Sequence, residues 1–517
     1  MKHIIATAAI AAAILASCTA EKKPVKDINS TVSPAGTSTF KADWDSIAAK
    51  YSFPEWFADA KFGIFIHWGV YAVPAFDNEW YPRNMYQQDH KVFKSHAERY
   101  GSQESFGYKD FIPMFKAERF NANEWMALFK ASGAKYVVPV AEHHDGFSMY
   151  ASDRNHWNSV DMGPKRDIVG ELKAAAEREG IVFGLSSHRL ENAWFYNGGM
   201  KFPSDVQDTS ISLYGFRLPG GREDYNEAVA LDWLAHVHEL IDKYQPQLFW
   251  FDWTVDSDVI RPYFNKFLAY YYNSAIDWGK QVAVNTKSGY PTNIQVGDVE
   301  RGKLDSMRKY PWQTDTSVGK HSWCYTEGEE NKTPEQIVHD LVDIVSKNGN
   351  LLLNIGPKAD GTITGEQANV LLNIGQWLNI NGEAIYGSRC WKKHGEGDKG
   401  GTAGSFTDNA ATEYSARDIR FTSKGNTLYA IVLSCKEPQT IVRSLTPENI
   451  GSAKIQSVRL LGSDDNIEWE LTPDGLKVKF PDKMPCSYAC SIRIDFDKPA
   501  GENLPSEMID IPFKHGS

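Results

Sequence analysis

The stretch Gln247-Leu248-Phe249-Trp250-Phe251-Asp252-Trp253 decides the fold class, because it contains four consecutive apolar residues that end in a carboxylate. Four apolar residues in a row leave no solvent-facing side, which is typical of a parallel strand buried on both faces. In a barrel of parallel strands, catalytic side chains lie at the carboxyl ends of the strands. Asp252 is therefore a candidate catalytic carboxylate, although an Asp at a strand end also commonly caps a turn or the next helix.

Similar apolar runs lie on both sides of this stretch and alternate with amphipathic helices between about residues 51 and 387. Together the runs occupy residues 62–68, 136–142, 181–186, 248–253, 281–285 and 350–355. The alternation is typical of a parallel α/β fold. No Gly-x-Gly-x-x-Gly pattern follows the first run, which argues against a dinucleotide-binding fold. Because about six or seven strands are clear instead of eight, we predict a distorted (β/α)8-like TIM barrel.

The pattern changes after Trp391, where short alternating runs follow one another with turn residues between them and no helix. These runs occupy residues 418–422, 427–433, 455–461, 476–480 and 491–496. They predict an antiparallel β-sandwich. We therefore divide the chain into a catalytic barrel domain at residues 45–392 and a C-terminal β-sandwich domain at residues 393–517, with the Gly-rich residues 394–405 at the seam.

The first residues have the features of a targeting segment. A short basic start is followed by an apolar stretch at residues 4–15, which is too short to span a bilayer. The stretch ends in Leu15-Ala16-Ser17-Cys18, which resembles the lipobox of bacterial lipoproteins; the alternative is an ordinary signal peptide with a chance Cys. We predict a signal peptide at residues 1–17, lipidation at Cys18, and a flexible tether at residues 18–44. This implies a lipoprotein of the bacterial cell envelope, periplasmic or associated with the outer membrane, that contacts the membrane only through its lipid.

Charge and cysteine usage exclude other classes. The chain has 55 basic and 66 acidic residues and a net charge of −11, which argues against nucleic-acid binding. No zinc-type Cys spacing is present. Cys486 and Cys490 would lie ~13 Å apart on one strand, too far for a disulfide unless the chain turns. Nothing in the sequence indicates an oligomeric state.

Polar side chains gather at the predicted strand ends, which meet on one face of a parallel barrel. They are His67, His143, His144, Asp145, His188, Asp252 and Lys287. A lone His on a strand is more often a core residue, but several at one face indicate a site. One chemistry is metal ligation by His67, His143, His144 and Asp145. Adjacent residues of a strand point to opposite faces, so only one of His143 and His144 can reach a given metal unless the strand has ended.

The other chemistry is glycoside hydrolysis. A retaining mechanism needs a nucleophilic carboxylate and a carboxylic acid ~5–5.5 Å apart. Asp252 supplies the first, and Glu300 is the best-placed candidate for the second.

The chain resembles the α-L-fucosidases of glycoside hydrolase family 29. The matching motifs are residues 56–69, Glu79-Trp80-Tyr81, residues 143–147, residues 164–170, Trp250-Phe251-Asp252 and residues 349–357, in the family's order. The resemblance extends from about residue 51 to residue 390, and the following sandwich is similar to the family's C-terminal domain.

The resemblance implies a retaining, exo-acting α-L-fucosidase that acts by double displacement on fucosylated oligosaccharides or glycoconjugates, without a cofactor or metal. Asp252 matches the nucleophile that forms a covalent fucosyl-enzyme. The matches to substrate-binding positions are His67, Glu79, Trp80, His143, His144 and Trp323.

Three departures from the family pattern concern the same site. Lys287 stands where many members have a sugar-binding Arg, which keeps the charge but loses the bidentate fork. Ser186-Ser187-His188 stands where many members have a Tyr after the third strand, and His188 is interpreted as its substitute. Gln313 stands where many members have a Glu, which leaves Glu300 as the acid/base. The rival carboxylates Asp298, Glu327 and Glu329 are interpreted as solvated loop charges.

Three alternatives stay open at this point: a metal-dependent barrel hydrolase that uses the His cluster, a catalytically dead sugar-binding protein, and an enzyme for α-L-galactose. The sequence does not give the fucosyl linkage. The long loop at residues 192–225 is expected to line the leaving-group side.

Overall fold

The computed structural model describes residues 27–287, 289–291, 293–400, 403–409 and 411–509. The predicted signal peptide and Cys18 lie outside these residues. Part of the predicted tether is packed on the barrel: Asn273 accepts a hydrogen bond from the Phe40 amide at 2.8 Å and donates to the Thr31 carbonyl at 2.7 Å. The tether prediction is therefore wrong for this part of the chain, because polar and aromatic residues within it find partners on the barrel.

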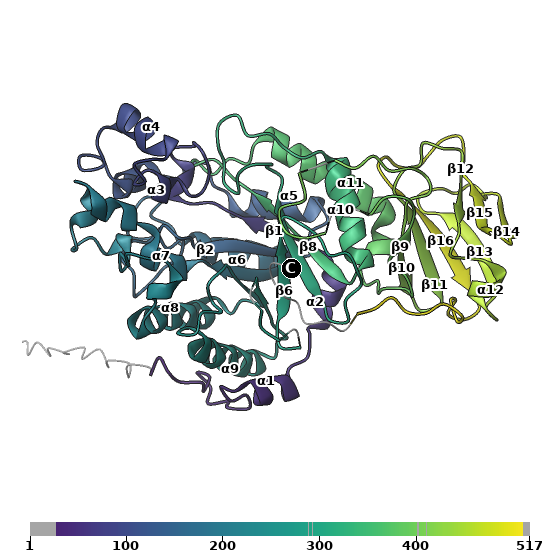
Figure 1. The fold of residues 1–517 in the computed structure, drawn as a ribbon, viewed down its shortest axis with the longest axis horizontal. Coiled ribbons are helices and arrows are strands. Elements are labelled where there is room, and N and C mark those ends of the chain that lie inside the picture. The colour runs from purple at the N-terminus through teal and green to yellow at the C-terminus, as the bar shows by residue number, and fades with distance from the viewer. Residues whose placement is uncertain (1–26, 288, 292, 401–402, 410, 510–517) are drawn as a thin grey trace, which may run out of the picture.

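Within the described residues, eight parallel strands form a closed barrel in the order β1 to β8, and β1 pairs with β8 to close it (Figure 1). They are β1 (Phe62–Ile66), β2 (Tyr136–Glu142), β3 (Val182–Ser187), β4 (Leu248–Phe251), β5 (Ala283–Thr286), β6 (Val296–Glu300), β7 (Trp312–Ser317) and β8 (Gly349–Ile355). The predicted barrel is confirmed. Its irregularities are a register shift between β2 and β3 and a short pairing of β5 with β6.

Strands β6 and β7 were not predicted, because their sequences are polar although every residue in them is buried. Their polar side chains bond one another inside the barrel. Asp298 accepts hydrogen bonds from Trp250 Nε1 at 3.0 Å and Gln313 Nε2 at 2.7 Å, and Gln313 in turn accepts one from the Tyr136 hydroxyl at 2.8 Å. These hydrogen bonds inside the core offset part of the cost of burying the polar groups, so polarity does not indicate exposure here.

Within the described residues, all helices except the last cover the outside of the barrel and its loops, and the last lies in the C-terminal part (Figure 1). The helices are α1 (Trp44–Lys50), α2 (Glu55–Ala60), α3 (Tyr81–Asn84), α4 (Lys91–Tyr100), α5 (Ala122–Ala131), α6 (Ile168–Glu179), α7 (Arg189–Phe195), α8 (Glu227–Tyr244), α9 (Arg261–Trp278), α10 (Pro334–Ser346), α11 (Gly365–Ile385) and α12 (Pro447–Ile450). Short 3-10 turns lie at Val70–Ala72, Tyr108–Met114, Asn197–Lys201, Asp205–Gln207, Ser212–Tyr214 and Arg222–Asp224. The Asn226 side chain caps α8, and Thr333 and Gln336 form a capping box at the start of α10. Among the described residues, no helix combines the length and the apolar character needed to cross a membrane.

The C-terminal part consists of two antiparallel sheets with the orders β13-β16-β11-β10-β9 and β12-β15-β14. The strands are β9 (Gly395–Glu396), β10 (Ile419–Lys424), β11 (Thr427–Val432), β12 (Gln439–Val442), β13 (Ile455–Leu460), β14 (Trp469–Thr472), β15 (Gly475–Lys479) and β16 (Cys490–Phe496). Val432 and Ile492 of one sheet share a core with Val442 and Val478 of the other, which confirms the predicted sandwich. The short strands β9, β12 and β14 were not predicted. The expectation of no helix after Trp391 is wrong, because the Thr446 side chain caps the short helix α12 by accepting a hydrogen bond from the Asn449 amide.

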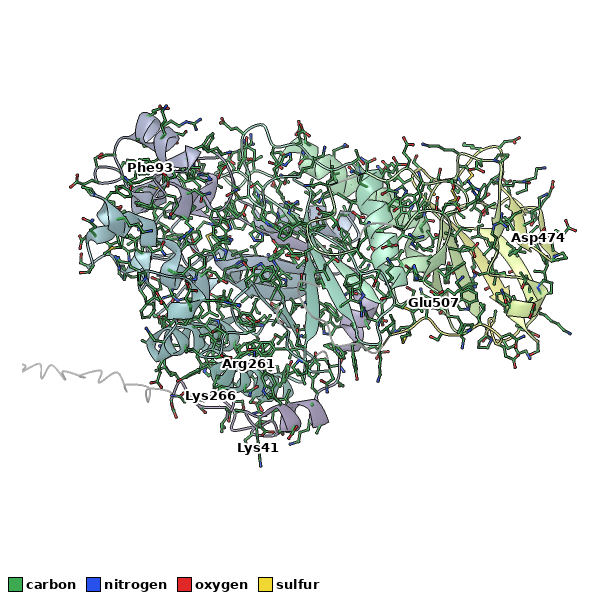
Figure 2. The ribbon with its side chains drawn as sticks, viewed as in Figure 1. Lys41, Phe93, Arg261, Lys266, Asp474 and Glu507 are labelled. Atoms are coloured by element: carbon green, nitrogen blue, oxygen red, sulfur yellow. A yellow bond between two sulfur atoms is a disulfide. The ribbon has the colours of Figure 1, made fainter. Side chains whose placement is uncertain are left out.

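The sandwich packs on the barrel through α10 and α11 (Figure 1). Arg420 of β10 forms a buried ion pair with Asp343 of α10 at 2.6 Å, and Trp377 of α11 donates to the Ala489 carbonyl at 2.7 Å. Charged side chains such as Lys41 and Asp474 point outward (Figure 2). A disulfide joins Cys435 and Cys490 within the sandwich.

Candidate active site

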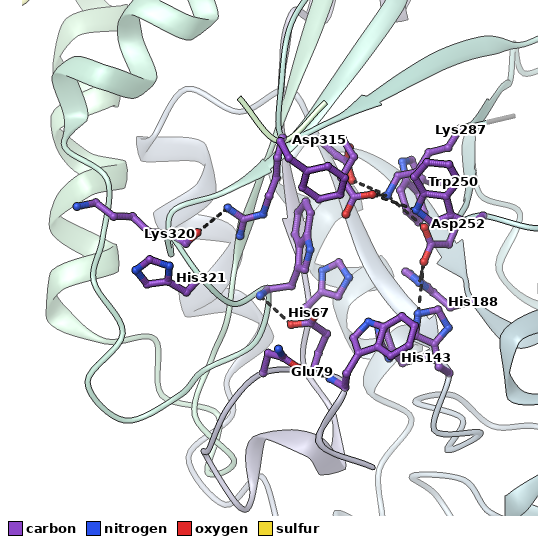
Figure 3. A pocket seen from close by; sticks show the side chains of 18 of the residues that line it. His67, Glu79, His143, His188, Trp250, Asp252, Lys287, Asp315, Lys320 and His321 are labelled. Carbon is purple, nitrogen blue, oxygen red and sulfur yellow. Dashed lines mark hydrogen bonds and ion pairs between the residues drawn. The ribbon is translucent and has the colours of Figure 1, made fainter. Parts of the chain in front are cut away.

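A cavity of about 620 Å³ opens at the carboxyl end of the barrel strands (Figure 3). Of the side chains predicted from sequence, Asp145 does not line it, because its buried carboxylate accepts a hydrogen bond from the Tyr108 hydroxyl at 2.6 Å. The other ten do: His67, Glu79, Trp80, His143, His144, His188, Asp252, Lys287, Glu300 and Trp323. Six of these directly follow a strand or end it, in chain order from β1 to β6. Convergence of neighbouring strand ends therefore builds the site, as parallel barrel geometry requires. The role of each side chain stays a prediction.

Asp252 lies directly after β4 and is 9% exposed. Its Oδ2 lies 3.3 Å from His188 Nδ1 and 3.4 Å from His144 Nε2, and its Oδ1 lies 3.1 Å from Lys287 Nζ. Burial raises the pKa of the Asp252 carboxyl, but the Lys287 charge and the two imidazoles outweigh burial and hold that pKa well below its ordinary value. Asp252 is therefore ionised, and its contacts in the cavity fix its orientation (Figure 3).

His144 carries a positive charge in this site. Burial lowers the pKa of its imidazole, but ion pairs with Asp252 and, at 3.6 Å, with Glu191 outweigh burial and raise the pKa to about 10. The Glu191 carboxylate also accepts a hydrogen bond from Thr254 at 2.9 Å. His144 is thus a charged group held between the candidate nucleophile and a second buried acid.

The imidazoles of His67, His143 and His188 are neutral. Burial is the largest cause and lowers the pKa of His67 and His143 well below the ordinary value. Burial also lowers the pKa of His188 to about 4, although its contact with Asp252 opposes this. His67 Nδ1 lies 2.8 Å from the Asn354 side-chain oxygen, so Nδ1 donates and the other ring nitrogen accepts. Buried His143 Nδ1 has no hydrogen-bond partner in the described part of the chain. Neutral imidazoles of this kind suit hydroxyl groups, which both donate and accept.

Glu79, Trp80 and Trp323 come from loops instead of strand ends. Glu79 is buried and accepts a hydrogen bond from the Trp323 amide at 2.9 Å, which joins the loop after β1 to the loop after β7. The Trp323 ring lies 5.2 Å from the His67 ring, and the Trp80 ring lies 5.4 Å from the His144 ring. These indoles give the cavity flat apolar walls beside its polar groups.

Lys287 is the electrostatic centre of the cavity. Its Nζ lies 3.1 Å from Asp252, 2.8 Å from Glu300 and 3.4 Å from Asp315, and the side chain is 3% exposed. It also lies over the Trp250 ring, 4.8 Å from the centroid. Burial lowers the pKa of this ammonium, but the surrounding carboxylates outweigh burial and raise the pKa well above its ordinary value. Lys287 is therefore charged.

Glu300 ends β6 and faces Asp252 across Lys287. Its ion pair with Lys287 and its hydrogen bond from Trp253 Nε1, at 3.1 Å, both end on Oε2. Because one nitrogen contacts both carboxylates at 3.1 Å and 2.8 Å, the contacting oxygens lie within about 6 Å of each other. This upper limit on the oxygen–oxygen distance is compatible with the ~5–5.5 Å between the carboxyl groups of a retaining pair.

Two groups of side chains have donor atoms close enough to hold a metal ion: His67, His143 and His188, and His144, His188 and Asp252, each within 4.8 Å. β2 ends at Glu142, so His143 and His144 are beyond the strand and both line the cavity, with ring centroids 4.2 Å apart. Each of the two candidate metal-binding groups nevertheless contains only one of His143 and His144.

The model of the α-L-fucosidase family matches residues 28–383. The chain belongs to the α-L-fucosidase family. The model of the α-L-fucosidase C-terminal domain matches residues 412–495. The predicted assignment to glycoside hydrolase family 29 and to the glycoside hydrolases is confirmed.

Relatives and solved structures of the α-L-fucosidase family match over most of the chain. Human plasma α-L-fucosidase is 34% identical over 482 residues, which cover 89% of this chain and 94% of the relative. Rat tissue α-L-fucosidase is 33% identical over 463 residues, which cover 87% and 90%. The crystal structure of Thermotoga maritima α-fucosidase in complex with fucose is 30% identical, with a TM-score of 0.70 over 88% of this chain and 100% of that chain.

Sequence reasoning missed several cavity residues, among them Asp315, Arg301 and Phe406. Burial, together with the nearby Asp298, raises the pKa of Asp315 well above its ordinary value, although Lys287 opposes this. Arg301 lies 4.8 Å from the centroid of the Trp323 ring and donates to the Lys320 carbonyl at 3.1 Å. Asp315 belongs to the polar strand β7, which the apolar pattern concealed.

Two predictions about neighbouring segments are wrong. Asp298 is not a solvated loop charge: it is fully buried in β6, because Trp250 and Gln313 donate to it. Among the described residues, none from 192–225 lines the cavity. That loop packs behind it, where Phe195 contacts Trp80 with rings 5.3 Å apart. Glu327 is exposed and Glu329 is partly exposed, and neither lines the cavity.

Lys287 gives a prediction for the pH profile. Asp252 must be ionised to attack, and Lys287 lowers its pKa. Replacing Lys287 with Met removes that cation, so the pKa of Asp252 rises and the acidic limb of the kcat/KM profile moves to higher pH. The measurement is kcat/KM for 4-nitrophenyl α-L-fucoside across pH.

Lys287→Arg keeps the charge and should leave the acidic limb near its original pH, and Lys266→Met controls for loss of a surface cation. An acidic limb that stays in place in Lys287→Met would show that Lys287 does not control the ionisation of Asp252.

Proposed function

We propose that the protein is a retaining, exo-acting α-L-fucosidase in which Asp252 is the nucleophile and Glu300 is the acid/base. The observation that carries the proposal is Lys287 Nζ, 3.1 Å from Asp252 and 2.8 Å from Glu300. One ammonium in contact with both carboxylates holds them close together, which supports a double displacement. Membership of the α-L-fucosidase family supports the same assignment.

In the first step, Asp252 attacks the anomeric carbon while Glu300, in its protonated form, donates its proton to the leaving oxygen. The carboxylate is already ionised and oriented by His144, His188 and Lys287, so attack requires no prior loss of a proton. In the second step, Glu300 removes a proton from water, which attacks the fucosyl-enzyme from the opposite side to Asp252. Two inversions give net retention.

Recognition of the sugar is assigned to the side chains around this pair. Neutral His67 and His143 and the carboxylate of Glu79 face the cavity and are suited to hydroxyl groups, and Trp80 and Trp323 offer apolar surface. Burying one methyl group contributes only ~0.8 kcal/mol, so paired hydroxyls supply most of the discrimination. The proposed substrates are therefore fucosylated oligosaccharides or glycoconjugates.

Turnover of 4-nitrophenyl α-L-fucoside, compared with the matching α-L-galactoside and repeated after exhaustive EDTA treatment, tests the proposal. We expect a clear preference for the fucoside and full activity in EDTA. No turnover would indicate a catalytically dead sugar-binding protein, and loss of activity in EDTA would indicate a metal-dependent enzyme. A preference for the galactoside would indicate an enzyme for α-L-galactose.

We further propose that the protein is a lipoprotein of the bacterial cell envelope, lipidated at Cys18. The support is the basic and apolar start of the chain and the Leu15-Ala16-Ser17-Cys18 sequence. The disulfide between Cys435 and Cys490 is compatible with an oxidising compartment. Labelled palmitate should be incorporated into the wild type and not into Cys18→Ala. Equal labelling of the two would contradict the assignment.

A further inference from the structure

A segment from beyond the barrel, residues 403–409, reaches the mouth of the cavity. It runs alongside residues 300–303, the segment that carries the proposed acid/base. The Phe406 amide donates to the Glu300 carbonyl at 3.0 Å, the Thr407 amide to the Arg301 carbonyl at 2.8 Å, and the Gly404 amide to the Lys303 carbonyl at 2.9 Å. These backbone bonds fix the segment relative to Glu300.

Side chains hold the same segment in place. Buried Asp408 forms an ion pair with Lys332 at 2.5 Å, and Asn409 donates to the Lys320 carbonyl at 3.1 Å. The approach is so close that a Cβ on Gly302 would lie 1.8 Å from the Gly404 carbonyl oxygen. A segment with this many fixed points presents its side chains in a defined position.

Phe406 is the side chain that this segment adds to the cavity, and it is 65% exposed. Its φ of 57° is in the left-handed region, which is unfavourable for a residue with a bulky side chain. An exposed ring gains little from burial, so folding alone gives no reason for an aromatic residue here. Neither step of the proposed reaction uses it.

A second exposed aromatic residue also contacts Glu300. Trp253 is 38% exposed, lines the cavity, and donates from Nε1 to Glu300 Oε2 at 3.1 Å. Thus Trp253 contacts the carboxylate of Glu300, and Phe406 contacts its backbone. The leaving oxygen of the substrate must reach that carboxylate to be protonated. Whatever is bonded to the leaving oxygen therefore lies beside these two rings.

We propose that Phe406 and Trp253 form a leaving-group subsite, in which the apolar face of the sugar unit that carries the fucose packs on their rings. The inference rests on the proposed function, because Glu300 as the acid/base fixes where the leaving group lies. Sugar rings have one face of C–H groups, and aromatic side chains bind such faces by stacking. The occupant is thus a hexose unit of a glycan, and Phe406 contributes to the choice among linkages.

The test compares two substrates that differ in the leaving group. α-L-Fucosyl fluoride has no second sugar unit that could occupy the subsite. The α1,2-, α1,3-, α1,4- and α1,6-linked fucosyl disaccharides have one. For Phe406→Ala, we expect the ratio of kcat/KM for the preferred disaccharide to kcat/KM for the fluoride to fall roughly 3–10-fold, the effect of losing one stacking contact. Phe406→Trp should largely preserve the ratio.

The matched control is Phe216→Ala, which removes another exposed phenyl ring, 41% exposed, that does not line the cavity. It should leave the ratio unchanged. An unchanged ratio in Phe406→Ala, or a fall of equal size in Phe216→Ala, would overturn the subsite. Failure of the proposed function would give a different result: the wild-type protein would not turn over α-L-fucosyl fluoride.

Discussion

Replacement of Asp252 by Gly is expected to lower kcat for 4-nitrophenyl α-L-fucoside by about 10⁴-fold or more, because the attacking group is lost while the rest of the cavity stays in place. The side chain is held by contacts with His144, His188 and Lys287, and none of these can replace it as a nucleophile in the same position. Steady-state kinetics with the purified variant measures the effect.

Azide should restore turnover of the Asp252→Gly variant, because a small anion fits the space of the missing carboxylate and Lys287 attracts it. Attack from the side of Asp252 inverts the anomeric carbon once, so the product is β-L-fucosyl azide, identified by its proton coupling in NMR. Asp256→Gly is the matched control, since Asp256 follows the same strand but is paired with Arg222 outside the cavity. Near-normal activity of Asp252→Gly, or an α-azide product, would remove Asp252 as the nucleophile.

Replacement of Glu300 by Gln is expected to lower kcat/KM by roughly 10²–10⁴-fold for substrates whose leaving group needs a proton, such as a fucosyl disaccharide. The loss in kcat/KM should be far smaller for 2-chloro-4-nitrophenyl α-L-fucoside, because that phenolate leaves without help. The fucosyl-enzyme should then accumulate, since water has lost its base, and a burst of phenol should precede slow turnover.

Azide distinguishes this role from a structural one. In Glu300→Ala, azide needs no base and should accelerate turnover with formation of α-L-fucosyl azide, the product of two inversions. Glu327→Gln, at an exposed carboxylate outside the cavity, is the control and should leave kcat/KM unchanged for both substrates. Equal losses for the two leaving groups would show that Glu300 is not the general acid.

The fold was predictable wherever the strands are apolar. The run from Leu248 to Phe251 indicates a buried parallel strand, and the structure has β4 at the same residues. Strands β6 and β7 could not be recognised, because residues such as Asp298, Gln313 and Asp315 interrupt every apolar pattern. Their burial depends on partners from other strands, such as Trp250 and Tyr136, and those pairings exist only after the barrel has closed.

The candidate site was predictable where a polar side chain directly follows an apolar strand, as His67, His188 and Asp252 do. Family motifs supplied Glu79, Trp80 and Trp323, which lie in loops without a local signal. Residues brought in by long-range packing could not be found in this way. Phe406 is separated from Glu300 by more than a hundred positions, and only the pairing of residues 403–409 with 300–303 places it at the cavity.

The central claim, that Asp252 becomes covalently fucosylated, is tested most directly by trapping the intermediate. 2-Deoxy-2-fluoro-α-L-fucosyl fluoride should form the enzyme ester quickly and release it slowly, because fluorine destabilises the oxocarbenium-like transition states and the activated leaving group favours the first step. Proteolysis and tandem mass spectrometry should then find one fluorofucosyl group, attached to Asp252. An enzyme that turns over α-L-fucosides but carries no label, or carries the label on another residue such as Glu300 or Asp315, would contradict the account.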